Sequence, residues 1–193
     1  MTSQSYTSIG IMSGSSLDGL DIVLNTITVE NDAYSFKILQ YETVSFPKPI
    51  LESLKEVRNL SSKDLFAFDI ELGIFIGNAV NVFISKYNIS QKIDFISSHG
   101  HTVFHFPSLG FTTQIGNGAQ INHITNIPVI NNLRAIDVAH GGQGTPIVPI
   151  GDLLLFPQYK YCLNLGGIMN ISIKEHNSIF SYDIGVCNQI INH

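Results

Sequence analysis

The polar turn at residues 13–19 is the first stretch whose residue types and spacing could do chemistry. The apolar residues Ile9 and Ile11 precede it, and the apolar run 22–24 follows it. This order predicts a strand, a tight turn and a second strand. Glycine permits positive φ and close approach of a ligand, and N–H groups and serine hydroxyls in such a turn form an anion-binding concavity. The alternative is an ordinary serine-rich hairpin turn.

Two carboxylates flank this turn. Asp18 and Asp21 stand where Mg²⁺ or a donor hydroxyl could be held. The segment has neither the G-x-x-x-x-G-K-[ST] spacing nor the G-x-G-x-x-G spacing of the two familiar phosphate loops. Because a strand is expected after Gly14, and not a helix, the pattern resembles the phosphate-holding hairpin of actin-like ATPases and sugar kinases.

The same pattern recurs roughly 150 residues later. Residues 161–165 predict a strand, Gly166 and Gly167 a turn, and residues 169–173 a returning strand. Two facing hairpins of this kind would hold a phosphate chain between two lobes. The repeat predicts an α/β fold, with an actin-like (ribonuclease-H-like) lobe on a mixed sheet at 1–155. A second similar lobe would begin at 156–193.

Composition narrows the class of protein. Of 193 residues, 44% are hydrophobic and 13% charged, enough for a buried core. The net charge of −5 with scattered Lys and Arg argues against nucleic acid as a partner. Residues 1–8 show no signal peptide, and no apolar run approaches the ~20 residues of a membrane span. Cys162 and Cys187 make no disulfide framework. We expect a soluble, cytoplasmic protein without a membrane partner.

The remaining segments alternate between helical and strand patterns. Residues 22–29 and 34–44 should complete an antiparallel meander, and residues 61–64 should cap a long helix. Gly73 and Gly77 should pack that helix closely against the sheet. Its expected buried stripe is Leu65, Phe68, Leu72, Phe75, Ala79, Val82 and Phe83. Other expected elements are helices at 50–60, 119–125 and 147–156, and strands at 111–116, 128–130 and 178–183.

Histidines follow a predicted parallel strand at 93–97. Ligands in open α/β sheets bind beyond the carboxyl ends of strands, so His99 in an expected loop at 98–102 is a candidate substrate contact. His99, His101 and His105 share the same parity in an extended segment. Three converging imidazoles could alternatively hold Zn²⁺ in a metal hydrolase.

Six ordered segments resemble motifs of the anhydro-N-acetylmuramic acid kinase family. They are GIMSGSSLDGLD at 10–21, SHGHTVFHFP at 98–107, QIGNGA at 114–119, LRAIDVAHGGQGTP at 133–146, LNLGGIMNI at 163–171 and DIGVCN at 183–188. The family uses ATP to open and phosphorylate the anhydro-sugar released from peptidoglycan. The resemblance implies an ATP-dependent sugar kinase of peptidoglycan recycling, with ATP and Mg²⁺ as cofactors and an amino sugar as substrate.

The resemblance also implies roles for single residues. Asp183 matches the catalytic aspartate, the base that activates water. Arg134 matches an arginine that contacts the acidic group of the sugar, and His99 and Asp137 complete the expected substrate set. Without the resemblance, Arg134 paired with Asp137 on a surface turn is the simpler interpretation. The expected ATP contacts are Gly14, Ser15, Ser16, Leu17, Asp18, Gly19, Leu20, Asp21, Gly166 and Gly167.

Members of this family are roughly twice as long as this chain. Their second half supplies most of the adenosine site, so we expect the chain to be an inactive kinase by itself. A homodimer, or a partner chain that supplies the missing lobe, would complete it. The alternative is a non-catalytic module. An exposed, unfinished lobe would favour association in either case.

Overall fold

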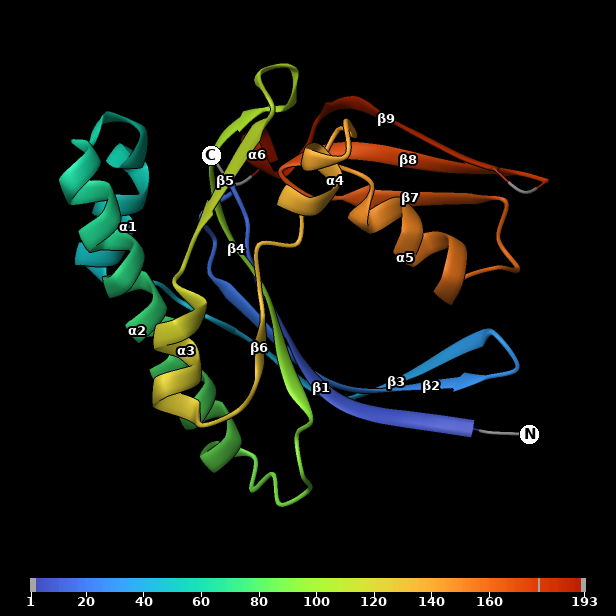
Figure 1. Ribbon diagram of the computed structural model, residues 1–193, viewed down its shortest axis with the longest axis horizontal. Helices are drawn as coiled ribbons and strands as arrows, with labels where there is room; N and C mark the ends of the chain where they lie inside the picture. Colours follow the sequence, from blue (N-terminus) through green and yellow to red (C-terminus); the bar gives the residue numbers. More distant parts are fainter. Residues whose placement is uncertain (1–2, 177, 192–193) are drawn as a thin grey trace.

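The computed structural model describes residues 3–176 and 178–191. Within these residues the chain forms a six-stranded mixed sheet and a separate three-stranded sheet (Figure 1). The large sheet has the strand order β3-β2-β1-β4-β5, with β6 also paired to β4. Its strands are β1 (Ser3–Ser13), β2 (Leu20–Glu30), β3 (Ala33–Val44), β4 (Phe95–Phe106), β5 (Phe111–Ile115) and β6 (Val129–Ile130).

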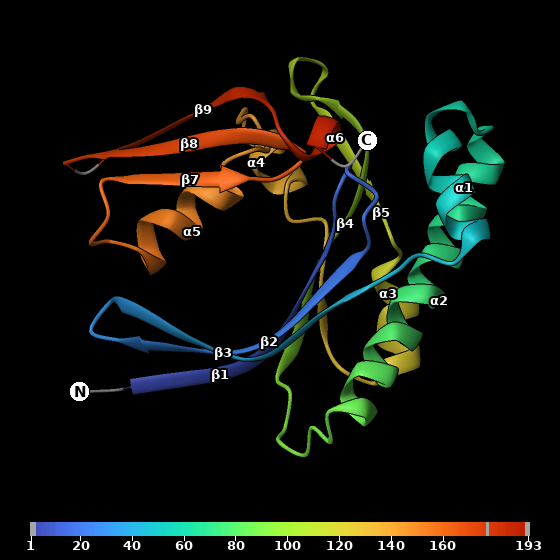
Figure 2. The ribbon, with the colours of Figure 1, turned by 180° about the vertical axis from the view of Figure 1, so that it is seen from behind.

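Strand directions confirm the predicted meander and the mixed sheet. β1, β2 and β3 are successively antiparallel. β4 lies parallel to β1 and to β6, and antiparallel to β5. Three helices and a 3-10 turn lie together beside one face of this sheet (Figures 1 and 2). They are α1 (Lys48–Glu56), a 3-10 turn at Val57–Asn59, α2 (Ser62–Lys86) and α3 (Gly118–Thr125).

Helix α2 begins at the predicted cap. Ser61 Oγ accepts the backbone N–H of Asp64 at 3.2 Å, which satisfies one of the free donors of the first turn. The stripe prediction holds for Phe68, Leu72, Ala79 and Phe83, which are buried. It is wrong for Val82, which is 65% exposed. Ile76 and Val80, which the predicted stripe left out, are buried as well, so the buried face of α2 is broader than predicted.

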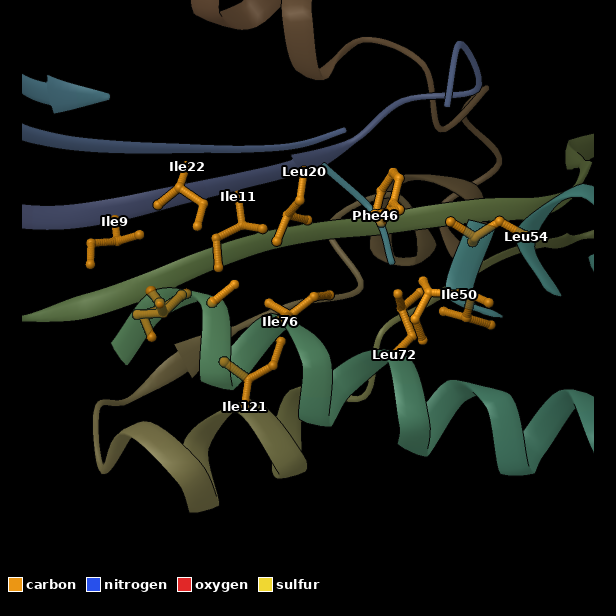
Figure 3. Packing of buried hydrophobic residues seen from close by; sticks show 14 of the residues in the cluster. Ile9, Ile11, Leu20, Ile22, Phe46, Ile50, Leu54, Leu72, Ile76 and Ile121 are labelled. Carbon is orange, nitrogen blue, oxygen red and sulfur yellow. The ribbon is translucent and has the colours of Figure 1, made fainter. Parts of the chain in front are cut away.

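The core lies between α2 and the strands of the meander. Figure 3 shows the aliphatic side chains of β1 and β2 directed toward the helix. On the sheet side, the residues Ile9, Ile11, Leu20, Ile22 and Leu24 are at most 4% exposed. Alternation along each strand leaves the intervening side chains, such as Met12 and Asp21, on the opposite face. One face of the large sheet is therefore buried against the helices, and its other face is available for a binding site.

Close packing at the two helix glycines is confirmed, but the neighbour is α3 and not the sheet. A Cβ on Gly73 would lie 2.7 Å from the backbone oxygen of Asn117, and one on Gly77 would lie 3.0 Å from Ile124 Cβ. α2 also has the length and apolar composition of a membrane span, so the prediction that no apolar run approaches that length is wrong. Eight of its residues are buried in the protein, so it serves as a core helix.

The small sheet repeats the opening meander. Its strands are β7 (Tyr161–Leu165), β8 (Ile168–Glu175) and β9 (Ser178–Val186), each antiparallel to the next. Figure 1 shows α5 (Ile147–Leu155) between this sheet and the far end of the β2–β3 hairpin, where Phe156 meets Phe36 edge to face at 5.5 Å. The remaining short helices are α4 (Ala135–Ala139), which contacts β5 of the large sheet, and α6 (Asn188–Ile191), which follows β9.

Candidate functional site

The first glycine turn connects β1 to β2, as expected. The carbonyl of Gly14 accepts the backbone N–H of Leu17 at 3.3 Å, and Leu17 has φ of 57°. A Cβ on Gly19 would lie 2.6 Å from Thr43 Cγ2, so only glycine allows β3 to pass this close. Leu20 is fully buried in the core. Leu20 of the predicted loop could therefore meet a ligand only through its backbone.

Both carboxylates beside this turn are held by hydroxyl groups. Ser16 Oγ donates to Asp18 Oδ1 at 2.8 Å, and Thr43 Oγ1 donates to Asp21 Oδ1 at 2.6 Å. Each bond uses one oxygen of a group that has two. The bonds orient both carboxylates and keep oxygen donors beside the turn.

The predicted loop at 98–102 is wrong, because these residues continue strand β4. Gly100 has φ of 72°, and a Cβ there would collide with the carbonyl oxygen of Ile115. The pairing with β1 shifts at this point: Ile11 lies opposite Ser98, but Ser13 lies opposite His101. This glycine bulge lets the strand go on and reverses which face the following side chains take.

His99 therefore points away from the core. It lies on the open face of the sheet, in a shallow hollow of about 260 Å³ that it shares with Met12, Asp21 and Leu133. Beyond the bulge, His101 and Val103 are buried. The hollow is thus lined both by Asp21, the carboxylate beside the glycine turn, and by His99.

Arg134 reaches this place from the segment before α4. Its Nε donates to His99 Nε2 at 2.7 Å, and its Nη1 donates to the carbonyl of Gly144 at 2.6 Å. Burial lowers the pKa of Arg134 from its ordinary value. Burial, and then the charge of Arg134, lower the pKa of His99, although its bond to the Gly100 carbonyl acts in the other direction.

Asp137 does not pair with Arg134, so the surface-turn interpretation is wrong. Its carboxylate accepts the backbone N–H of Gly144 at 2.6 Å, and its carbonyl accepts the N–H of Gly142 at 2.8 Å. Asp137 therefore closes the glycine-rich loop 141–144, which in turn supplies the carbonyl that holds Arg134.

The three histidines have different partners. His101 Nδ1 lies 2.9 Å from Ser13 Oγ, and His105 Nδ1 lies 3.0 Å from Thr112 Oγ1. Burial lowers the pKa of His101 to about 4. No group of three His, Cys, Asp or Glu side chains placed to hold a metal ion occurs in 3–176 or 178–191. The shared parity that suggested zinc is broken by the bulge at Gly100.

The second glycine turn is tied to the segment after β9. The carbonyl of Gly167 accepts the N–H of Cys187, and that of Gly166 accepts the N–H of Asn188, both at 3.1 Å. Asp183 is exposed in β9, directly opposite Asn170 on β8. Asn170 is itself opposite Asn164 on β7.

These three polar side chains form a row on one face of the small sheet. Neither asparagine was among the predicted site residues, and the cross-strand register is the signal that identifies them.

The expected site residues fall into two groups. Residues 14–21, His99, Arg134 and Asp137 belong to the large sheet and the segment beside it. Gly166, Gly167 and Asp183 belong to the small sheet. Among the residues that the structure describes, no hydrogen bond or ion pair joins Asp183 to Arg134.

The mixed α/β sheet fits one lobe of a kinase. It carries a serine–glycine turn after β1, and His99 of β4 binds Arg134. The family model described as anhydro-N-acetylmuramic acid kinase matches residues 6–193, and the chain belongs to this family. It is 38% identical to the kinase of that name from Clostridioides difficile (strain 630), over 95% of this chain. It is also 38% identical to that from Crocosphaera subtropica over 95%, and 32% identical to that from Bacillus cereus (strain Q1) over 94%.

The chain spans about half the length of these relatives. The matched region covers 52% of the C. difficile and B. cereus proteins and 51% of the C. subtropica protein.

Proposed function

We propose that this chain provides the phosphate turns, the sugar-binding arginine and the catalytic base of an ATP-dependent anhydro-N-acetylmuramic acid kinase. The observation that carries the proposal is the shared hollow. Asp21, next to the phosphate turn, and His99, which holds Arg134, line the same space. A phosphoryl acceptor bound by Arg134 would therefore lie beside the phosphate donor, and positioning is the main requirement of phosphoryl transfer.

In this proposal each group has a separate task. The N–H groups and hydroxyls of 14–19 and of Gly166 and Gly167 hold the phosphates of ATP. Arg134 binds the lactyl carboxylate of the sugar, and Asp183 removes the proton from the attacking water. Asp18 and Asp21 suit Mg²⁺, because this ion is commonly bound by one or two carboxylates together with substrate phosphates. The bound ion would neutralise charge on those phosphates.

We further propose the actin-like arrangement of two lobes, 1–155 and 156–193. Support comes from the antiparallel strands β3-β2-β1, which are followed in the sheet by β4 and its partner β6, both parallel to β1, and from the repeated meander. Helix α5, which ends at the proposed boundary, contacts β3 as well as β8 and β9. A kinase that consumes ATP is expected in the cytoplasm.

The exposed apolar face of the small sheet supports the proposal that a partner binds there. Tyr161, Leu163 and Leu165 are 55–59% exposed, although register puts them on one face with Ile171 and Ile173. α5 occupies the other face, where Ser172 is buried. We propose that a polypeptide equivalent to the second half of the relatives covers the apolar face with a helix, as α2 covers the first meander. A second copy of this chain is the alternative occupant.

The test supplies the unmatched half of the C. difficile relative as a separate polypeptide. We expect the two chains to form a complex that transfers phosphate from ATP to anhydro-N-acetylmuramic acid, whereas this chain alone does not. Leu163→Asp should prevent the complex, and Val82→Asp, on an exposed part of α2, should not. A complex without transfer would contradict the kinase proposal. Turnover by a monomer of this chain, or no complex, would contradict the partner proposal.

Within that complex, Asp183→Asn isolates the base. The amide keeps the shape but cannot take a proton, so turnover should fall by at least ~10²-fold while ATP binding stays nearly unchanged. The matched control is Asp32→Asn, in the exposed β2–β3 turn, with turnover equal to the parent. An Asp183→Asn variant with more than about a tenth of parental turnover would exclude Asp183 as the general base.

A further inference from the structure

We infer that His99 is a positioning residue which, as one defined neutral tautomer, fixes the edge of Arg134 that an anion can reach. His99 was expected to touch the substrate directly. Its two ring nitrogens are both already engaged, one by Arg134 and one by the carbonyl of Gly100. The assignment of the anion as a sugar carboxylate rests on the proposed function, whereas the positioning role rests on the geometry alone.

The tautomer follows from the two partners. Arginine nitrogens can only donate, so Nε2 of His99, 2.7 Å from Arg134 Nε, must carry a lone pair. A backbone carbonyl can only accept, so Nδ1, 2.9 Å from the oxygen of Gly100, must carry the proton. His99 therefore acts as a neutral acceptor. A second proton at Nε2 would set two donors and two positive charges against each other.

The two bonds to Arg134 decide its free edge. A guanidinium has five N–H donors, and a carboxylate can meet it side-on through Nε and one terminal nitrogen, or end-on through both terminal nitrogens. His99 occupies Nε, which closes the side-on approach. Gly144 takes one donor of Nη1. An anion must therefore approach the terminal nitrogens, and Nη2 is the nitrogen that neither bond uses.

Other groups make this arrangement rigid. Gly144 is held by the carboxylate of Asp137, and its φ of 68° and its contact with Val138 leave no room for a side chain. The charged and titratable neighbours of His99 are Arg134 from the α4 segment, Asp21 from β2 across the hollow, and His101 on its own strand. Burial lowers the pKa of His99, and the charge of Arg134 acts in the same direction.

The first test reads the tautomer directly. In the ¹⁵N-labelled chain, we expect neutral His99 to show one protonated nitrogen, Nδ1, and to take up its second proton at a lower pH than an ordinary histidine. A slowly exchanging Arg134 Nε–H signal should be present and should disappear in His99→Leu. A proton on Nε2, or an unchanged Arg134 signal in His99→Leu, would overturn the inference. This readout does not depend on any ligand.

The second test reads the consequence for anion binding. We compare N-acetylmuramic acid, which has the lactyl carboxylate, with N-acetylglucosamine, which lacks it. His99→Leu should weaken binding of the acidic sugar by about tenfold or more, the equivalent of ~1.4 kcal/mol. It should leave the neutral sugar unchanged. His99→Gln, whose amide oxygen can accept from Nε, should restore most of the affinity, and His123→Leu on α3 is the control.

Equal losses for both sugars would mean a merely structural role and would contradict the inference. If neither sugar binds the parent chain, the proposed function loses support, while the tautomer experiment still decides the positioning role of His99.

Discussion

The two meanders of this chain have the same pattern and opposite surroundings. In the first, Ile9 faces Leu24 and Ile11 faces Ile22 across β1 and β2, and all four are at most 4% exposed. In the second, Leu163 faces Ile171 across β7 and β8, yet Leu163 is 55% exposed. Strand alternation creates an apolar face in both. Only in the first meander does a helix, α2, cover the apolar face, so that its side chains form a core.

Their anchoring differs as well. The first glycine turn follows Ser13, which is buried and paired with the imidazole of His101 on the neighbouring strand. The second glycine turn is held by backbone N–H groups of Cys187 and Asn188. The first anchor can titrate and the second cannot. Helix packing shows the same contrast, because Gly73 of α2 is tightly enclosed, whereas a Cβ on Gly151 of α5 would have no atom within 4 Å.

The largest expected effect separates the two apolar faces. Leu24→Ala removes buried methyl groups beneath α2 and should lower the free energy of unfolding by about 2–5 kcal/mol. Leu163→Ala makes the same chemical change on the open face and should cost less than about 1 kcal/mol in this chain alone. Urea unfolding of both variants measures the difference. Equal losses would show that the second face is already covered.

The next effect concerns the titratable anchor. The pKa of His101 is about 4 in the folded protein, against an ordinary value of 6.5. Above pH 6.5 the imidazole is neutral in both the folded and the unfolded state, so protonation of His101 does not lower the free energy of unfolding. As the pH falls from 6.5 toward 4, the unfolded chain takes up a proton that the folded chain does not, so stability is lost. The loss should reach a size on the order of 3 kcal/mol.

His101→Gln provides the comparison for this pH effect. The amide can still bond to Ser13 Oγ but cannot titrate, so its unfolding free energy should fall less between pH 6.5 and pH 4. His123→Gln, an exposed histidine of α3, should follow the parent. Parallel pH curves for the parent and His101→Gln would rule out His101 as the source.

The smallest expected effects compare the two covering helices. Gly73→Ala places a methyl group against the backbone of Asn117 and should destabilise the chain by about 1–3 kcal/mol through overpacking. Gly151→Ala should instead stabilise it by roughly 0.5–1 kcal/mol, since alanine favours the helix and meets nothing there. Thermal unfolding shows whether each substitution lowers or raises the stability of the folded chain. Destabilisation by Gly151→Ala would mean that α5 is as tightly enclosed as α2.

Much of the fold was predictable from local pattern. The two meanders, the cap at Ser61 and the helix at 118–125 depend on alternation, turn residues and capping, all of which neighbouring residues determine. The glycine turns at 14–19 and 166–167 were found for the same reason. The family was also predictable from the sequence, because six short motifs occur in the order that is typical of it.

Tertiary contacts decided the rest. The bulge at Gly100 depends on its pairing with both β1 and β5, so the sequence by itself placed His99 in a loop and all three histidines on one face. The partners of Arg134 are a strand residue 35 positions away and a loop carbonyl, neither of which spacing could identify. Whether an apolar strand face becomes core is equally non-local: Ile22 is buried because α2 lies over it, and Leu163 is exposed because α5 lies on the other side.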